Sequence, residues 1–465
     1  MAYWYSRFVF ERALAALYLV AFLVAANQFV PLLGERGLLP VSRFTQSVPF
    51  RASPSLFYLS HSDTAFRVCA WVGVALAVLT LIGWPQQRGS VVAAVVWASM
   101  WLLYLSFVNV GQTFYGFGWE TLLLESGFLA IFLGGWTTQP SMWLVWMYRW
   151  LLFRVMFGAG LIKIRGDSCW RDLTCLNYYY ETQPIPNSLS WYFHWLPAGV
   201  HKAGVAINHV VELIVPFGYF APQPLASIAG FLTMGFQGML IVSGNLSWLN
   251  WLTLALCVPA LDDRFLSWLP MTAPALQEPD VIHRGAIYLL AAIVGVLSIA
   301  PTLNMLSPRQ VMNTSFEPLH IVNTYGAFGS ITRTRYEIVI EGSDDSSTWR
   351  EYEFKGKPGD PARVAPQIAP YHLRLDWLMW FAAFSPRPQD EWFIALLQRL
   401  LQGDAATLSL LKTNPFPDHA PRYLRARYYR YWFTTADERR QTGRWWNREL
   451  ASEYVRPITL EAFSQ

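Results

Sequence analysis

Long runs of apolar residues dominate the first two thirds of the chain. Windows of about 20 mostly apolar residues, the length that spans a bilayer, occupy 13–31, 68–84, 91–110, 224–243 and 285–306. A shorter window lies at 245–261, and windows containing titratable residues lie at 114–136, 141–164 and 203–221. This pattern predicts an α-helical multi-pass membrane bundle of about nine helices over residues 1–308. The first window has no small-residue cleavage site after it, so we expect a retained helix and not a cleaved signal peptide.

The pattern changes after residue 308. Residues 336–341 and 350–354 alternate between apolar and polar side chains around a Gly/Ser/Asp loop, which predicts a β-hairpin. Residues 321–323 and 424–433 also favour strands, and 392–401 has helical spacing. We expect a soluble C-terminal domain of the α+β class, β-rich with helices, over 309–465.

The charge distribution supports this division. Residues 1–308 hold 15 Lys or Arg and 13 Asp or Glu, whereas the remaining 157 residues hold 20 and 18. The net charge of +4 is shared evenly, so neither part has the basic excess of a nucleic-acid-binding protein. Phosphate-binding loops, dinucleotide fingerprints and hydrolase elbows are absent from the sequence, and we expect no cofactor and no metal.

Four charged residues lie inside consecutive apolar windows: Glu120, Glu125, Arg149 and Arg154. An unpaired charge within a bilayer is costly, so such residues face the interior of a bundle and find partners. Two acids on one helix and two bases on the next predict pairing between the helices. The pairs would either staple the bundle or line a polar cavity.

A second polar group surrounds Lys163. Asn208, His209 and Glu212 share one face of the window 203–221, because they are spaced i, i+1 and i+4. One H-x-x-E copy is weak evidence for a metal, since a carboxylate di-metal site needs two. The alternatives are a satisfied polar cluster or a proton-handling pair. The window 203–221 begins about 40 residues after Lys163, and the connector has no spanning segment, so both helix ends open on the same side of the membrane. This predicts a shared pocket with Asn208, His209 and Glu212 as its floor, and a rim of Lys163, Arg165, Asp167, Trp170 and Asp172.

The loop after Lys163 is the most polar stretch of the first part. Its candidate motif comprises Arg165, Asp167, Cys169, Trp170, Arg171, Asp172 and Cys175. The spacing of Cys169 and Cys175 does not fit a structural zinc site. A small disulfide loop and two reduced thiols remain open.

At this loop the sequence resembles the lipase maturation factor family. The matching stretches are 8–27, 117–132, 149–160, 161–186, 208–216, 244–253 and 318–326, with KIRGDSCWRDLTCLNYYYETQPIP as the core. The resemblance implies a multi-pass membrane protein that assists folding and export of dimeric secreted lipases in the endoplasmic reticulum. It also implies a cytoplasmic N-terminus, a lumenal C-terminal part that binds the client, and a chaperone without agreed catalytic residues.

A shorter stretch is similar to the vitamin K-dependent carboxylase and horizontally transferred transmembrane domain superfamily. Residues 159–163 read A-G-L-I-K, and that superfamily's A-G-x-x-K motif supplies a catalytic lysine base. This resemblance implies a membrane enzyme with Lys163 as base. Such an enzyme needs an enclosed cavity around Lys163, lined by several of Lys163, His209, Glu212, Glu120 and Arg154, with Lys163, His209 and Glu212 as the catalytic candidates. A lysine that only reaches the membrane interface is the simpler interpretation.

The predicted strand 424–433 is rich in arginine and aromatic residues. Its candidate client-binding residues are Arg422, Arg425, Arg427, Tyr429 and Trp432, since such side chains are enriched at protein interfaces. A solvated strand is the alternative. The expected partners are the lipid bilayer and a secreted lipase or other client, with no nucleic acid. The expected location is the endoplasmic reticulum membrane in a eukaryote or the cytoplasmic membrane in a bacterium. Asn313-Thr314-Ser315 is a glycosylation sequon, usable in a eukaryotic secretory compartment.

Overall fold

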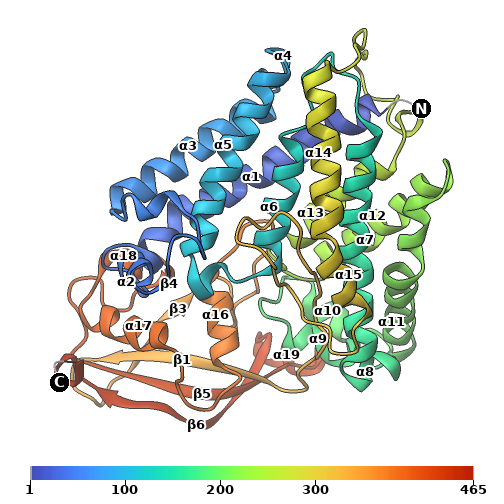
Figure 1. Ribbon diagram of the computed structural model, residues 1–465. Coiled ribbons are helices and arrows are strands. Elements are labelled where there is room, and N and C mark those ends of the chain that lie inside the picture. The colour runs from blue at the N-terminus through green and yellow to red at the C-terminus, as the bar shows by residue number, and fades with distance from the viewer. Residues whose placement is uncertain (1–2, 464–465) are drawn as a thin grey trace.

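The computed structural model describes residues 3–463, and a helical bundle occupies the first part of the chain (Figure 1). Among the described residues, seven helical segments are long and apolar enough to cross a membrane. They are α1 (Trp4–Leu33), α3 (Asp63–Leu81), α5 (Ser90–Val110), α7 (Met142–Arg165), α11 with η3 (Ala198–Leu213, Val215–Phe220), α12 (Leu225–Ser243), and α14 with α15 (Val281–Leu297, Ile299–Leu306). The multi-pass membrane architecture is therefore confirmed.

Two helices are shorter than the windows that predicted them. Helix α6 (Gly118–Ala130) replaces the window 114–136, and α13 (Leu249–Cys257) replaces 245–261. Almost every side chain of α6 is buried, as expected of a helix that is enclosed on all sides. Protein surrounds their ends, so these segments can leave the helical conformation without exposing polar backbone to lipid.

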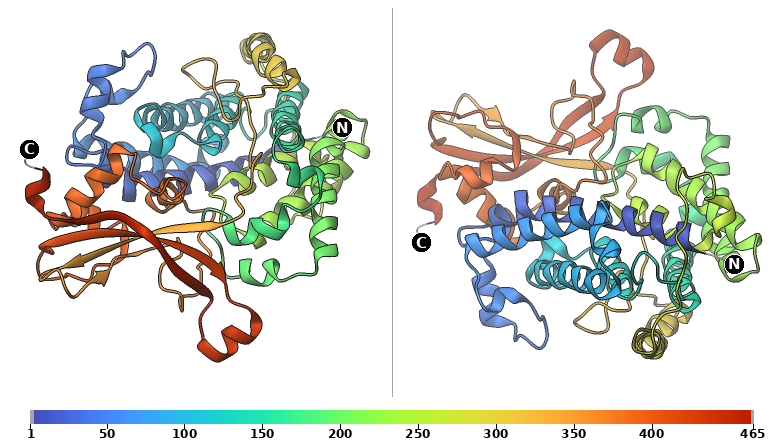
Figure 2. Two further views of the ribbon diagram at one scale, coloured as in Figure 1. Left: turned by 90° about the horizontal axis from the view of Figure 1, so that it is seen from below. Right: turned by 90° about the horizontal axis from the view of Figure 1, so that it is seen from above.

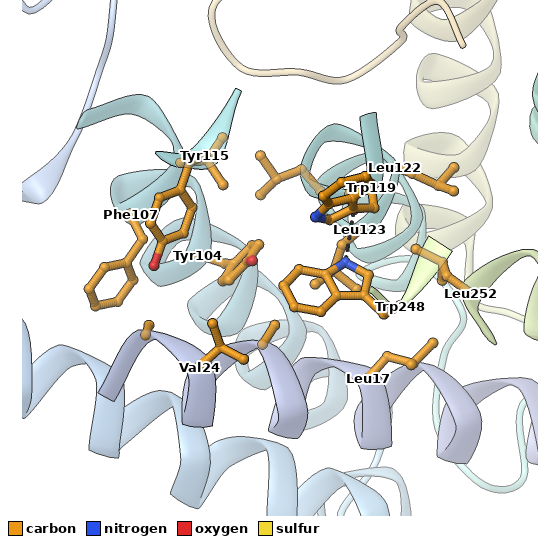
Figure 3. Close-up of a cluster of buried hydrophobic side chains, with 14 of the residues drawn as sticks. Leu17, Val24, Tyr104, Phe107, Tyr115, Trp119, Leu122, Leu123, Trp248 and Leu252 are labelled. Atoms are coloured by element: carbon orange, nitrogen blue, oxygen red, sulfur yellow. Dashed lines mark hydrogen bonds between the residues drawn. The ribbon is translucent and has the colours of Figure 1, made fainter. Parts of the chain in front are cut away.

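Aromatic side chains fill the space between α1, α5, α6 and α13 (Figure 3). Tyr104 lies edge-on to the ring of Phe22 at 5.6 Å between centroids. The Trp248 indole donates a hydrogen bond to the carbonyl of Trp119 at 3.0 Å. This bond joins the starts of α13 and α6, so the two short helices are fixed side by side.

The start of α1 and the C-terminal domain lie at opposite ends of the bundle (Figure 1). At the α1 end, the Trp4 indole donates to the carbonyl of Trp136 at 2.9 Å, and the Trp4 amide donates to Asp263 at 2.9 Å. At the other end lie the short helices α8 (Ser168–Arg171), α9 (Leu176–Thr182) and α10 (Ser190–His194) of the loop after α7. The remaining short elements of the first part are α2 (Val41–Ser47), η1 (Leu56–Tyr58), α4 (Trp84–Gln87), η2 (Gln112–Tyr115), η4 (Val258–Ala260) and η5 (Asp263–Phe265).

The C-terminal domain contains a four-stranded antiparallel sheet of order β2-β1-β5-β6. Its strands are β1 (Arg335–Ser343), β2 (Arg350–Glu351), β5 (Tyr423–Phe433) and β6 (Trp446–Ile458). A second pair joins β3 (Glu353–Phe354) to β4 (Leu411–Thr413). The helices are α16 (Arg374–Ala382), α17 (Glu391–Leu401), α18 (Ala405–Leu408) and α19 (Ala436–Thr442), with η6 (Leu460–Phe463) after β6. The predicted hairpin, the strand at 424–433 and the helix at 392–401 are confirmed.

The segment between the two parts packs into the bundle. A Cβ on Gly158 would lie 2.6 Å from the carbonyl oxygen of Tyr325, so this glycine allows the segment to approach α7 closely. Residues 321–323, predicted as a strand, form only an isolated bridge between Ser315 and Asn323. That prediction was wrong because these residues pair with bundle side chains and not with a neighbouring strand.

Candidate functional site

Lys163 and Glu212 form a buried ion pair between α7 and α11. The Lys163 ammonium donates to Glu212 Oε1 at 2.5 Å and to Asn208 Oδ1 at 2.9 Å. It also lies 5.0 Å from the ring centroid of Trp170. The predicted juxtaposition of Lys163 with Asn208 and Glu212 is therefore present.

Local sequence explains this geometry. A Cβ on Gly160 would lie 2.7 Å from Leu213 Cδ2 and 3.0 Å from Glu212 Cβ, so glycine lets α7 approach α11. On α11 the i, i+4 spacing lets the Asn208 amide donate to Glu212 Oε2 at 2.9 Å. Asn208 thus holds the carboxylate in place for the lysine one helix away.

His209 does not join this pair. Its Nε2 is 2.9 Å from the carbonyl oxygen of Trp170, while Nδ1 is buried without a hydrogen-bond partner in the described structure. The ring therefore fixes the loop after α7 to α11. Its predicted place in the pocket floor differs from the structure because residues i and i+1 on a helix point about 100° apart.

Of the predicted rim, Trp170 lies beside Lys163, whereas Arg165, at the end of α7, and Asp167, in the loop after it, bind other elements. Asp167 forms an ion pair with Arg333 at 2.7 Å and accepts from the Cys169 amide at 3.0 Å. The Arg333 hydrogen bonds lower the pKa of Asp167 to about 2. Arg165 donates to the carbonyl of Met305 at 2.8 Å. Two further loop residues, Arg171 and Asp172, are exposed.

Cys169 and Cys175 form a disulfide. Both are buried, together with Trp170, in a small cluster that includes Tyr179 and Tyr180. Of the two open interpretations, the structure has the disulfide loop. It fixes the turn that carries Trp170 over Lys163.

A cavity of about 640 Å³ lies beside the Lys163–Glu212 pair. Its walls come from α7, α12 and α13, from α16 of the C-terminal domain, and from the segment 312–332. Figure 1 shows α16 between the lower ends of the helices and the sheet. Trp170, Asn208, Gln237 and Asn250 also line the cavity, whereas His209, Glu120 and Arg154 do not.

Glu125 and Arg154 form one of the predicted pairs between α6 and α7. Glu125 also accepts hydrogen bonds from the Tyr325 hydroxyl at 2.7 Å and the Asn323 amide at 3.1 Å. Arg154 donates to the carbonyl of Asn323 at 2.6 Å. The pair therefore anchors the segment that connects the bundle to the C-terminal domain.

The other two intramembrane charges do not pair with each other. Glu120 forms its ion pair with Arg374 of α16 at 2.7 Å. Arg149 donates to the carbonyls of Pro259 at 3.1 Å and Tyr219 at 3.2 Å, so backbone oxygens take the place of an acid. Their predicted pairing was wrong because each finds a partner outside α6 and α7.

The candidate client-binding residues are partly engaged within the sheet. Arg425 and Arg427 both contact Glu341 of β1, Arg425 at 2.5 Å and Arg427 at 3.5 Å. Tyr429 is buried, Trp432 is half-buried beside Arg430, and Arg422 is exposed. Arg422 and Trp432 are therefore the members that are neither buried nor bound to Glu341.

Three residues that contribute to this region were not predicted from the sequence. Arg374 lies in an aromatic stretch outside the membrane windows, where a lone arginine signals a buried partner. Asn250 and Gln237 lie within apolar windows, and the Asn250 amide donates to Gln237 Oε1 at 2.8 Å. Over residues 3–463, no group of three or more His, Cys, Asp or Glu is placed to hold a metal ion.

Comparison with known proteins gives a consistent result. Residues 5–268 match the family profile described as lipase maturation factor transmembrane domain, and residues 321–456 match the lipase maturation factor C-terminal domain. Lipase maturation factor 1 of Bos taurus is 45% identical, over 99% of this chain and 90% of the relative. The Homo sapiens protein of that name is 44% identical, over 99% of this chain and 88% of the relative.

A more distant relative is lipase maturation factor 2 of Mus musculus, 28% identical over 97% of this chain and 83% of the relative. No solved structure matches the chain. The two family profiles cover the bundle as far as residue 268, including Lys163 and Glu212, and most of the sheet of the C-terminal domain. The chain is therefore an integral membrane protein that belongs to the lipase maturation factor family.

Proposed function

We propose that this protein assists the maturation of a secreted lipase or similar client, acting as a chaperone. The observation that carries the proposal is the family match, which extends over both parts of the chain. Relatives named lipase maturation factor 1 share 42–45% of their residues with it. This favours the maturation factor over the carboxylase-like alternative, for which Lys163 would have to act as a base.

The disulfide supports the proposed compartment. Cys169–Cys175 lies at the end of the bundle that carries the C-terminal domain, and disulfides persist in oxidising compartments. That end would face the lumen of the endoplasmic reticulum in a eukaryote, or the periplasm in a bacterium. A secreted client passes through the same compartment.

The C-terminal domain offers a surface for such a client. Strand β6 is an edge strand, and beyond the helices the β5–β6 hairpin extends with α19 at its tip (Figure 2). Edge strands and exposed Arg and aromatic side chains are common features of protein recognition. We propose that the client lies along this hairpin and contacts Arg422, directly before β5, and Trp432 of β5.

The test uses the full-length protein, co-expressed with a secreted homodimeric lipase in cells that lack their own maturation factors. The measured quantity is secreted lipase activity per unit of lipase mass. Wild-type protein should raise this ratio, whereas the double variant Arg422→Glu/Trp432→Ala should raise it less at equal expression. Arg387→Glu, at an exposed position before α17, is the matched control and should act as wild type.

Two results would contradict the proposal. If wild-type protein leaves the lipase activity per unit of lipase mass unchanged, the protein is not a maturation factor for that lipase. A double variant as effective as wild type would retain the function and move the client surface elsewhere.

A further inference from the structure

The cavity beside Lys163 has the shape of a binding site for a small amphiphile. Its volume of about 640 Å³ falls within the range of small-molecule sites. Val155, Met156 and Ala159 of α7 face Leu240 of α12 and Leu249 of α13 across it. Most of the wall is therefore carbon, as an apolar chain requires.

One end of the cavity is polar but carries no net charge. Lys163 and Glu212 neutralise each other, and Asn208 binds both. An ammonium has three donors, and two of those of Lys163 are used. Asn250 Oδ1 has no hydrogen-bond donor within residues 3–463, although its amide nitrogen is engaged. A head group with hydroxyls can accept from the unspent Lys163 donor. Asn250 binds Gln237, which contacts Met156, so Asn250 Oδ1 is available about two turns of α7 farther along the wall.

The rim of the cavity is apolar and open. Phe381 of α16 and Phe384, two residues after it, are 45% and 51% exposed, and Met312, which also lines the cavity, is 42% exposed. Exposed apolar side chains that border a cavity mark a route for an apolar ligand. Because two of the wall helices, α7 and α12, are long and apolar enough to cross the membrane, the bilayer is the source of that ligand.

We propose that this cavity binds an uncharged lipid with one acyl chain and a hydroxyl-bearing head group, of the monoacylglycerol class. The volume suits one chain better than several. A charged head group would leave an uncompensated charge beside the neutral Lys163–Glu212 pair, which is unfavourable at a buried position. This inference concerns a ligand of the bundle and is independent of the client surface.

The direct test is photolabelling of the purified full-length protein in nanodiscs. The probe is a monoacylglycerol with a diazirine in its acyl chain, and unlabelled monooleoylglycerol is the competitor. Labelling should saturate and map to peptides of α7, α12, α13 and α16. Ala159→Phe fills the cavity from α7 and should weaken apparent affinity at least about tenfold. Ala203→Phe on the exposed face of α11 is the matched control and should leave it unchanged.

A second variant tests the charge argument without changing the shape of the site. In the wild-type protein, monooleoylglycerol should compete with the probe, whereas the charged lipids oleate and oleylamine should compete poorly. Glu212→Gln leaves the Lys163 charge unbalanced, so oleate should become the better competitor, with a shift of about tenfold or more in its relative potency. Thermal unfolding of each variant in the same nanodiscs shows whether it is folded.

Three results would overturn the proposal: non-saturable labelling, labelling confined to lipid-facing peptides, or equal labelling of folded Ala159→Phe and Ala203→Phe. Competition by oleate as strong as that by monooleoylglycerol in the wild-type protein would also refute the uncharged head group. If the protein fails to support lipase maturation but is labelled as expected, the proposed function is wrong and the lipid site stands.

Discussion

Arg374 of the C-terminal domain and Glu120 of α6 form an ion pair of 2.7 Å in which both side chains are fully buried. Arg374 also donates to the carbonyl of Phe114 at 2.6 Å, and the Tyr104 hydroxyl donates to Glu120. The guanidinium lies 3.4 Å from the ring centroid of Tyr115. The bundle and the C-terminal domain therefore share one buried polar network, which holds the domain at a fixed position on the helices.

We expect Arg374→Met to destabilise the protein by about 3–5 kcal/mol, because it leaves the buried Glu120 without a counter-charge. The double variant Arg374→Met/Glu120→Gln should recover part of this loss. Thermal unfolding in detergent, followed by tryptophan fluorescence, measures both. Arg387→Met, at an exposed arginine, is the control and should cost little. An Arg374→Met protein as stable as this control would show that the network is not structural.

The Lys163–Glu212 pair leads to a prediction that separates a staple from a base. Lys163→Arg keeps a positive charge opposite Glu212, but it removes a possible base because arginine does not deprotonate. For a chaperone, lipase maturation by Lys163→Arg should remain near the wild-type level. Lys163→Met should unfold more readily, because Glu212 is then buried without a partner. Loss of maturation in a folded Lys163→Arg protein would instead support the carboxylase-like interpretation.

The apolar pattern predicted the membrane bundle well because each long helix follows an apolar run, as α12 does for the window 224–243. The proximity of Lys163 and Glu212 could be predicted because the connector between their helices has no spanning segment, so both helix ends lie on the same side of the membrane. The length of α6 could not be predicted, since it depends on the protein that encloses its ends.

Contacts between residues far apart in the chain could also not be predicted from the sequence. Glu120 and Arg374 are 254 residues apart, and Glu125 and Asn323 are 198 residues apart. Local periodicity describes neighbours within one element, whereas these contacts depend on how the C-terminal domain docks. The cavity beside Lys163 has the same origin, because α16 supplies one of its walls.

The Cys169–Cys175 disulfide should stabilise the loop after α7. For so short a closed loop, chain entropy predicts a contribution of about 2 kcal/mol. Cys169→Ser/Cys175→Ser should lower the unfolding temperature, and wild-type protein should resist alkylation at these positions unless reduced. Cys69→Ser, at a half-buried free cysteine of α3, is the control. Alkylation of Cys169 in untreated wild-type protein would contradict the disulfide.

The sequon at Asn313 reports the orientation of the bundle. Asn313 is exposed, follows the end of α15, and accepts a hydrogen bond from the Gly326 amide at 3.3 Å, in the segment that leads to the C-terminal domain. In eukaryotic cells, a lumenal C-terminal domain should give a glycan at Asn313 that endoglycosidase removes, visible as a shift in gel mobility. Asn313→Gln should abolish the shift. Glycosylation of a sequon added before α1, together with an unmodified Asn313, would show that the bundle has the opposite orientation.

Asp167 makes the stability of the loop after α7 depend on pH. The pKa of Asp167 is lowered to about 2 in the folded protein, mainly by the Arg333 hydrogen bonds, whereas an unfolded aspartate titrates near about 3.9. The folded state therefore binds fewer protons, and its stabilisation is fully present above the unfolded pKa and lost as pH falls toward 2.

Asp167→Asn should accordingly lower the unfolding temperature by a constant amount between pH 7 and about pH 5, with a gap to wild type that narrows below about pH 4. Unfolding scans across this range, in one detergent and at one salt concentration, measure the gap. Arg333→Gln should give the same profile, because it removes the main cause of the lowered pKa. Asp172→Asn, at an exposed neighbour, is the matched control and should give a small difference from wild type. A gap for Asp167→Asn that widens below pH 4 would contradict the assignment.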